Sequence, residues 1–248
     1  MSELLNLPDL ALERVLLYVG VESLLRNVVR VNKYMYNFIH SHPHVLQHYF
    51  FLGVNEVPIF QDPAQIEKIL KHARIFHCFE LPYMTCTFDK STEFMDHCMN
   101  KYFVQSAIYN NNLEWLDLSS TQISKLSFLK HLYNLDTLVL DSCQKIDVKE
   151  FENLKFCNQL SNLNAGFTNL DGETLVKVIK PPIVHIDISG IMLDLDHVKG
   201  LLKVCHSTLL TVHCGINNSV SKEQFEDVNR QYRDVCFSFS PPRYDFYW

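Results

Sequence analysis

Leu113-Glu-Trp-Leu116-Asp-Leu118-Ser-Ser-Thr121-Gln-Ile123 is the clearest copy of the pattern that decides the fold. It places apolar residues at L-x-x-L-x-L spacing and follows them with a short polar turn. Four further copies follow at steps of 22, 25, 23 and 26 residues between their middle apolar positions. Those positions are Leu138, Leu163, Ile186 and Val212. A near-constant period in the twenties indicates an array in which each repeat buries its apolar face against its neighbours.

The spacing is typical of leucine-rich repeats and predicts an α/β solenoid, with parallel strands on the concave face and helices on the convex face. Apolar residues at helical spacing predict return helices over 124–131, 148–157, 171–179, 194–205 and 221–232. We expect a divergent first repeat with its strand near Met84 and its helix over 91–99, and a seventh strand centred on Val235. The array would then hold about six or seven repeats.

Composition restricts the class of protein. Of the 248 residues, 47% are apolar and 20% charged, which is typical of a packed globular chain. A net charge of -6 argues against nucleic acid as the main partner, because phosphate binding requires basic surface. The eight cysteines form no C-x-x-C pair, so we expect no zinc site. We expect neither a secretory leader nor a membrane span, and therefore free thiols in a reducing, intracellular compartment.

The first forty residues predict three short helices. Apolar residues at 12, 15, 16 and 19 form one helical face after Leu7-Pro8, and Gly20 ends that helix. Ser23 can cap a second helix over 24–31, and a third follows over 33–39. Three helices this short cannot cover their own apolar residues, so some apolar surface should remain for a partner.

These residues resemble an F-box. The family pattern L-P-x-x-x-L-x-x-[IV]-[LF] and its continuation are matched from Leu7 to Lys33, with Asn32 where many members carry Cys. Tyr34 or Tyr36 stands in place of the usual Trp. The resemblance implies that this segment binds a Skp-type adaptor. The implied adaptor-binding residues are Leu7, Pro8, Leu12, Val15, Leu16, Leu24, Val28, Val31 and Tyr36. The alternative is that these helices only cap the solenoid.

With repeats downstream, the chain resembles F-box/leucine-rich-repeat proteins. The resemblance implies a non-catalytic substrate-recognition subunit of a Skp-cullin-F-box ubiquitin ligase, cytoplasmic or nuclear, with adaptor and cullin as partners and no cofactor. The expected domains are an F-box over 1–40, a helical linker over 41–80 and repeats over 81–248. The competing hypothesis is a scaffold or assembly protein that uses its repeats without recruiting a ligase.

The linker and the tail carry weaker signals. Histidines at 40, 44 and 48 would share a helix face, but Pro43 breaks that helix, so we expect no metal site. Asp62-Pro63 should open a helix through His72 that holds the adaptor and the repeats at a fixed distance. The aromatic tail 243–248 should cover the open edge of the terminal repeat.

Target binding is expected between the leucines, at positions that alternate toward the concave face. Several aspartates occur there without Lys or Arg, and Trp115 could act as an apolar anchor. The predicted target-binding residues are Trp115, Asp117, Asp141, Asn164, His185, Asp187 and His213. They favour a basic or donor-rich target segment with one apolar side chain. The alternative is that small polar residues simply suit an exposed parallel sheet. No phosphate loop or catalytic triad motif is present, so we expect no enzyme activity.

Overall fold

The computed structural model describes residues 8–16, 33–35, 38, 78–80, 91–101, 113–180, 182–215, 220–232 and 235–239. Five expectations lie outside these residues: the helix over 24–31, the linker helix after Asp62, the histidines at 40, 44 and 48, the strand near Met84, and the tail 243–248. Within the described part, α1 (Asp9–Leu16) begins directly after Pro8. The carbonyl of Pro8 accepts the N–H groups of Ala11 at 2.9 Å and Leu12 at 3.0 Å.

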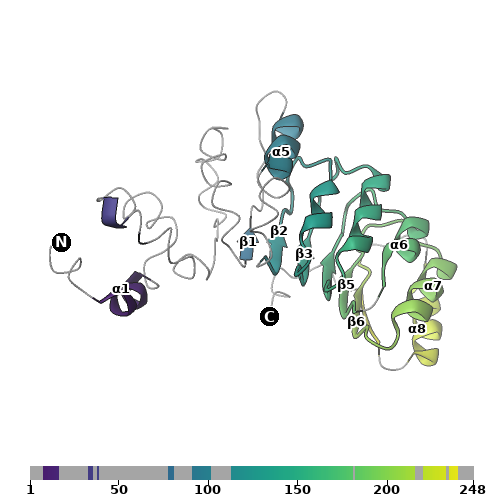
Figure 1. The fold of residues 1–248 in the computed structure, drawn as a ribbon. Helices are drawn as coiled ribbons and strands as arrows, with labels where there is room; N and C mark the ends of the chain where they lie inside the picture. Colours follow the sequence, from purple (N-terminus) through teal and green to yellow (C-terminus); the bar gives the residue numbers. More distant parts are fainter. Residues whose placement is uncertain are drawn as a thin grey trace.

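Seven strands of the described part form one parallel sheet in the order of the sequence. Figure 1 shows the labelled strands side by side in that order. The seven strands are β1 (Cys78–Glu80), β2 (Trp115–Asp117), β3 (Thr137–Val139), β4 (Asn162–Asn164), β5 (His185–Asp187), β6 (Thr211–His213) and β7 (Cys236–Ser238). The predicted middle residues of β2 to β6 align in register, each leucine, isoleucine or valine beside its equivalent in the next strand. The predicted repeat period is therefore confirmed.

Both ends of the sheet differ from the prediction. The first described strand is β1, in which Phe79 pairs with Leu116, and the sequence did not predict it. Its sequence lacks the L-x-x-L-x-L spacing, so the repeat pattern could not reveal it. At the other end Phe237 pairs with Val212, two residues later than the predicted Val235. Val235 is buried but lies just before β7, so the presence of a buried apolar residue was not enough to predict the register of this strand.

The return segments lie on one side of the sheet (Figure 1). They are α5 (Ser91–Met99), η8 (Ser127–His131), η9 (Val148–Phe156), α6 (Gly172–Val178), α7 (Leu195–Cys205) and α8 (Lys222–Gln231). The positions of all six confirm the prediction, but η8 and η9 are 3-10 helices. Aspartates begin several returns: Asp171 accepts the N–H of Thr174 at 2.8 Å, and Asp194 forms a capping box with His197.

A continuous apolar core lies between the sheet and the returns. The strand residues Leu116, Leu138, Leu163 and Ile186 are buried, as predicted from the repeat. The return segments contribute the large buried rings Phe128, Phe151 and Phe225. Burying one such leucine is worth roughly 1.5–3 kcal/mol, so successive repeats stabilise one another.

The turn after each strand adopts the same backbone conformation. Ser120, Ser142, Phe167 and Gly190, each two residues beyond the final apolar position of its strand segment, all have positive φ. Their N–H groups extend the inter-repeat ladder, as when Ser142 donates to the carbonyl of Gly166 at 2.9 Å. Gly190 has a second reason to be glycine, because an added Cβ would lie 2.6 Å from the Phe167 ring.

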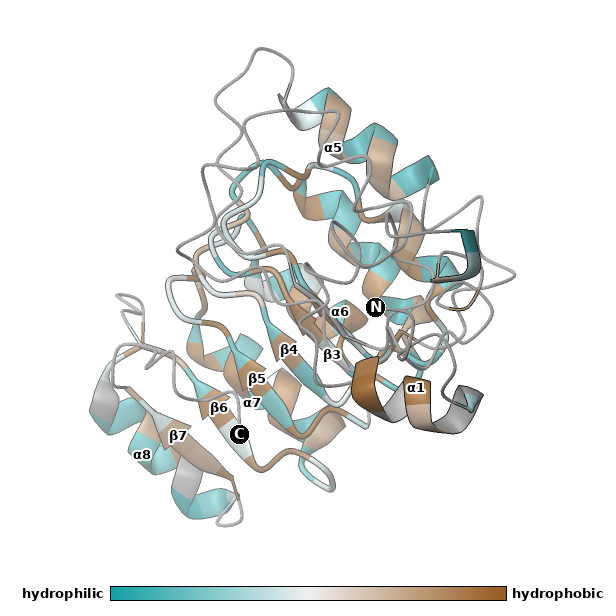
Figure 2. Cartoon of the chain, turned by 90° about the vertical axis from the view of Figure 1, so that its left-hand side faces the viewer, coloured by the Kyte–Doolittle hydropathy of each residue, from teal (hydrophilic) through white to brown (hydrophobic). Residues whose placement is uncertain are grey.

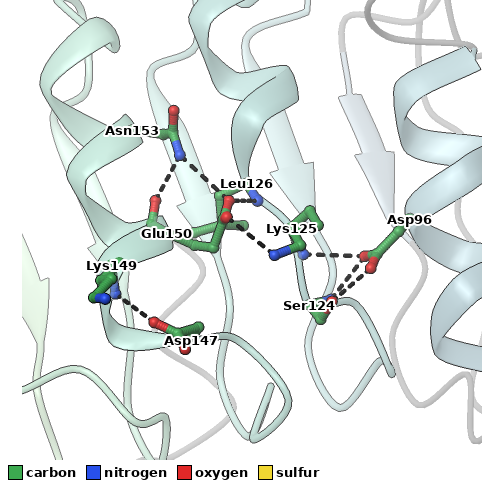
Figure 3. A network of polar contacts seen from close by, with 8 residues as sticks. All are labelled: Asp96, Ser124, Lys125, Leu126, Asp147, Lys149, Glu150 and Asn153. Carbon is green, nitrogen blue, oxygen red and sulfur yellow. Dashed lines mark hydrogen bonds and ion pairs between the residues drawn. The ribbon is translucent and has the colours of Figure 1, made fainter.

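Polar side chains also join neighbouring repeats on the return side, as shown in Figure 3. Asp96 of α5 accepts the backbone N–H groups of Ser124 at 2.8 Å and Lys125 at 3.0 Å. Glu150 of η9 accepts the N–H of Leu126 at 2.9 Å and lies 3.4 Å from Lys125 Nζ. Carboxylates on one repeat thus satisfy donors on the preceding or following one, which fixes the stacking geometry.

Hydrophilic and hydrophobic residues alternate along the return helix α5, as Figure 2 shows, so one face can pack on the core.

No helix in the described part of the chain combines the length and the apolar character needed to cross a membrane. Six cysteines of the described part, at positions 98, 143, 157, 205, 214 and 236, are free thiols.

Candidate functional site

The candidate site is the sheet face opposite the return helices, which we call the concave face. Strand register places two rows of side chains on it. The first row contains Trp115, Thr137, Asn162, His185, Thr211 and Cys236. The second contains Asp117, Val139, Asn164, Asp187, His213 and Ser238. Asp141 lies two residues beyond Val139. The structure therefore brings all seven predicted target-binding residues to one face, and no Lys or Arg occupies either row.

Three side chains of the second row make the same local hydrogen bond. The Oδ1 atoms of Asp117, Asn164 and Asp187 accept the backbone N–H two residues later, at 2.8, 3.0 and 2.9 Å respectively. These bonds close the turn at the end of each strand. The Asp and Asn residues therefore have a structural role at the strand ends, which any test by substitution must preserve.

Hydrogen-bond acceptors converge beside Gly166, a feature that the sequence prediction missed. The position of an added Cβ at Gly166 lies 3.1 Å from Asp141 Oδ1, 3.3 Å from Asn164 Oδ1 and 3.4 Å from Asp187 Oδ1. Glycine leaves room for these oxygens, because an added Cβ would make tight contacts with all three of them. The sequence signal is the single glycine within the Asn164-Ala-Gly166 end of its strand segment.

The carboxylates of this face destabilise one another. Burial raises the pKa of Asp117 above its ordinary value, opposed by hydrogen bonds from Ser119 and reinforced by repulsion from Asp141. Burial also raises the pKa of Asp141, with repulsion from Asp187 as a further cause. A face with repelling carboxylates and converging oxygens favours a cationic or hydrogen-bond-donating partner.

The predicted target-binding residues differ in exposure. His185 is exposed, with its Nδ1 2.6 Å from Thr211 Oγ1. Four more are half-buried, namely Trp115, Asp141, Asn164 and Asp187. Asp117 and His213 are only 8% and 6% exposed. Strand alternation gives the direction of a side chain, but its exposure also depends on its neighbours.

The predicted adaptor-binding residues in α1 fall into two groups. Leu12 and Leu16 are 0% and 1% exposed, so they belong to the core of the protein itself. Pro8 is exposed and Val15 is 41% exposed. Leu7, Leu24, Val28, Val31 and Tyr36 lie outside the described residues. Tyr34, 43% exposed and stacked on Phe38 with a 6.1 Å centroid distance, adds apolar surface near this segment.

The thiols of the repeats are poor candidates for nucleophiles. Burial raises the pKa of Cys143 to about 11 and that of Cys214, beside His213, to about 12. Nucleophilic cysteines require the opposite shift, since the thiolate is the reactive form. Within the residues that the structure describes, no group of three or more His, Cys, Asp or Glu side chains is placed to hold a metal ion.

Comparison with known proteins supports the fold. No protein-family model matches the sequence, and no curated protein matches it. The crystal structure of the Rad7 and Elc1 complex in yeast is similar with a TM-score of 0.51 and 13% identity, over 71% of this chain and 43% of that chain. An internalin from Listeria monocytogenes has a TM-score of 0.46 and 12% identity, over 70% of this chain and 44% of that one.

This chain therefore spans less than half the length of either solved chain. At such low identity the likeness to the yeast structure concerns the fold alone. It agrees with the seven-stranded parallel sheet and its return helices in assigning the repeat region to an α/β solenoid of leucine-rich type. A solenoid of this kind offers an extended surface for protein interaction.

Proposed function

We propose that this protein is the substrate-recognition subunit of a Skp-cullin-F-box ubiquitin ligase, in the cytoplasm, the nucleus or both. The observation that carries the proposal is the concave face itself, a parallel sheet with converging acceptors and no Lys or Arg in its two rows. The F-box resemblance of residues 7–33 adds the recruiting element. The chain would bind a target protein and present it, and other subunits of the ligase would catalyse the transfer of ubiquitin.

The target segment should be basic or rich in hydrogen-bond donors. Asp141, Asn164 and Asp187 supply the acceptors, and His185 offers an exposed ring on the neighbouring row. Half-buried Trp115 lies on the first row of β2 and can receive one apolar side chain, because tryptophan is enriched among residues that dominate binding energy. The yeast neighbour, a complex of two proteins, is consistent with a protein as partner.

The adaptor would contact the exposed side of α1. Leu12 and Leu16 hold this helix against the protein's own core, which leaves Val15 and Pro8 to meet a partner. Burying the exposed part of one valine is worth about 1 kcal/mol, so several such contacts are needed for a stable complex. The exposed ring of Tyr34 can supply another.

Binding of a purified Skp-type adaptor, measured by calorimetry, tests the recruiting role. Val15→Asp should weaken or abolish the complex without unfolding the chain, because the side chain already faces solvent. Val15→Ala should weaken it only slightly. Leu16→Asp is unsuitable as a test, since a charge at a buried site would destabilise the helix itself. An adaptor that binds wild type and Val15→Asp equally well, or binds neither, would refute this role.

A scaffold without ligase recruitment is the second candidate. The observation that favours it is the burial of Leu12 and Leu16, because a segment that only caps the solenoid would turn its apolar residues inward. The adaptor titration separates the two functions, since a scaffold would retain the target but give no heat with adaptor.

A further inference from the structure

One buried hydroxyl of the repeat region has no hydrogen bond. Ser189 is 0% exposed, and its Oγ has no partner among the residues that the structure describes. Buried polar groups are nearly always hydrogen-bonded in native proteins. A buried hydroxyl without a partner is therefore a candidate contact for a bound group, and its position decides which group it could serve.

The backbone shows where the Ser189 side chain projects. The carbonyl of Gly166 accepts the Ser142 N–H at 2.9 Å, and the carbonyl of Ser189 accepts the N–H of Phe167 at 2.7 Å. Gly166 and Ser189 each donate their own N–H to the Oδ1 atom two residues earlier, so they occupy equivalent positions in successive repeats. The Cβ direction at Gly166 leads to the three converging acceptor oxygens, and the Ser189 side chain therefore projects onto the same face.

Both neighbours of Ser189 in its row are glycines. Gly166 lies on one side, and the Gly190 N–H donates to the carbonyl of Gly215 at 3.1 Å, which places Gly215 on the other side. Neighbouring strands lie about 4.8 Å apart, and neither glycine has a side chain to fill that distance or to bond the hydroxyl. The Ser189 hydroxyl therefore borders the space over Gly166, which the three acceptor oxygens also surround.

We propose that Asp141, Asn164, Asp187 and Ser189 form a pocket for one primary ammonium group, the Nζ of a lysine side chain in the target. The Oδ1 atoms of the first three residues lie within 3.4 Å of a single point, so one compact cation can contact three repeats at once. An ammonium has three donors and suits such a set. These three side chains are half-buried and leave an approach from solvent. In assigning the lysine to a target protein, this inference rests on the proposed function.

The remaining acceptor atoms suit an ammonium better than a guanidinium. Asp141 Oδ2 accepts the Ser142 hydroxyl at 2.9 Å, and Asp187 Oδ1 accepts the Ser189 N–H at 2.9 Å. Each carboxylate thus has one oxygen already engaged. Neither offers a free pair of oxygens to the planar, two-pronged contact that arginine prefers, whereas lysine acts as a point charge.

The charges of the face also favour a single cation. Burial raises the pKa of Asp141, and repulsion from Asp187 raises it further. An ammonium between the two carboxylates would replace this repulsion with attraction to both. Neither row of the concave face contains Lys or Arg, so the rows themselves supply no such cation.

Titration of the full-length protein with blocked amino acids tests the pocket directly. The protein is prepared with isotopically labelled glycine and read by NMR, so that its seven glycines give at most seven amide signals. The signal that is missing from a Gly166→Ala sample identifies Gly166. Lysine blocked at its α-amino and carboxyl groups should shift this signal saturably. Blocked arginine should bind several-fold more weakly, and blocked lysine acetylated at Nζ should not bind, because acetylation removes the charge.

Two variants locate the contact. Ser189→Ala removes a hydroxyl that has no partner, so the urea midpoint should not fall while the affinity for blocked lysine drops several-fold. Asp141→Asn should also lower this affinity several-fold, because it removes one of the two charges. Asp196→Asn is the matched control, since Asp196 is an exposed residue of α7 on the return side, and it should leave the affinity unchanged.

The absence of a saturable shift of the Gly166 signal with blocked lysine would overturn the proposal. So would equal binding of blocked arginine, or binding of blocked lysine that survives both Ser189→Ala and Asp141→Asn. Spermidine carries ammonium groups without a peptide backbone, and several-fold tighter binding of spermidine would assign the pocket to a free polyamine instead of a lysine side chain. The titration contains no adaptor or cullin, so its failure is distinguishable from failure of the ligase role, which the adaptor calorimetry tests.

Discussion

Asp117→Asn should make the protein more stable at neutral pH. Asp117 is 8% exposed, and its Oδ1 accepts the Ser119 N–H at 2.8 Å. Asparagine keeps that acceptor and removes the charge, and the chain contains its own precedent in Asn164, which makes the same bond to Gly166 at 3.0 Å. The substitution thus separates the structural hydrogen bond from the electrostatic cost.

The sign of the effect follows from the raised pKa of Asp117, which is caused by burial and by repulsion from Asp141. When the folded-state pKa lies above the unfolded value, the ionised carboxylate lowers the free energy of unfolding at neutral pH. Removing the charge by Asp117→Asn should therefore raise the free energy of unfolding at neutral pH. As the pH falls through the folded-state pKa toward the ordinary value of 3.8, wild type becomes protonated and the difference should vanish.

Urea unfolding of wild type, Asp117→Asn and Asp117→Ala across this pH range measures the effect. Asp117→Ala removes both the charge and the acceptor of a buried N–H, so it should be about 1–3 kcal/mol less stable than Asp117→Asn at every pH. The reasoning would be refuted by an Asn variant that is less stable than wild type at neutral pH, or by a difference that does not change with pH. A charge that lowers stability is typical of a residue positioned for binding.

Three further substitutions test the packing of the solenoid by urea unfolding. Gly190→Ala should lower the free energy of unfolding by about 1–2 kcal/mol because of its φ of 72°, and further because the added Cβ clashes with Phe167. In a Phe167→Ala background the loss should be smaller. Equal losses in both backgrounds would exclude the ring contact. Leu138→Ala should cost about 2–5 kcal/mol because the side chain is fully buried, and a neutral result would place it outside the core. Lys177→Ala removes an ion pair with Glu152 that solvent screens, so it should leave the urea midpoint unchanged within error; a clear loss of stability would show a stronger coupling between repeats.

The sequence was sufficient to predict the repeat array, because the pattern encodes a local geometry that recurs. Leu116, Leu138 and Leu163 align in adjacent strands as their spacing predicts. The pattern failed at Phe79, where the repeat diverges, and at Phe237, where a neighbouring buried valine gave a competing register. A terminal repeat packs on one neighbour only, so its sequence is less constrained than that of an internal repeat.

The candidate site was predicted less completely. Alternation along each strand correctly brought Asp141, Asn164 and Asp187 to one face, because the direction of a side chain is a local property. Burial is a property of the whole chain, so the pattern could not show that Asp117 and His213 are covered. The convergence of acceptors beside Gly166 depends on register between three repeats and becomes visible only in the folded sheet.

The most direct test of the account is affinity capture from cells with wild type, Val15→Asp and Asp141→Lys, read by quantitative mass spectrometry. If the adaptor and the target bind separate surfaces, Val15→Asp should lose the Skp-type adaptor and cullin but keep the target. Asp141→Lys should lose the target but keep adaptor and cullin. Wild type that recovers no adaptor or cullin, or variants that lose adaptor and target together, would contradict a receptor that holds its target and its ligase at different sites.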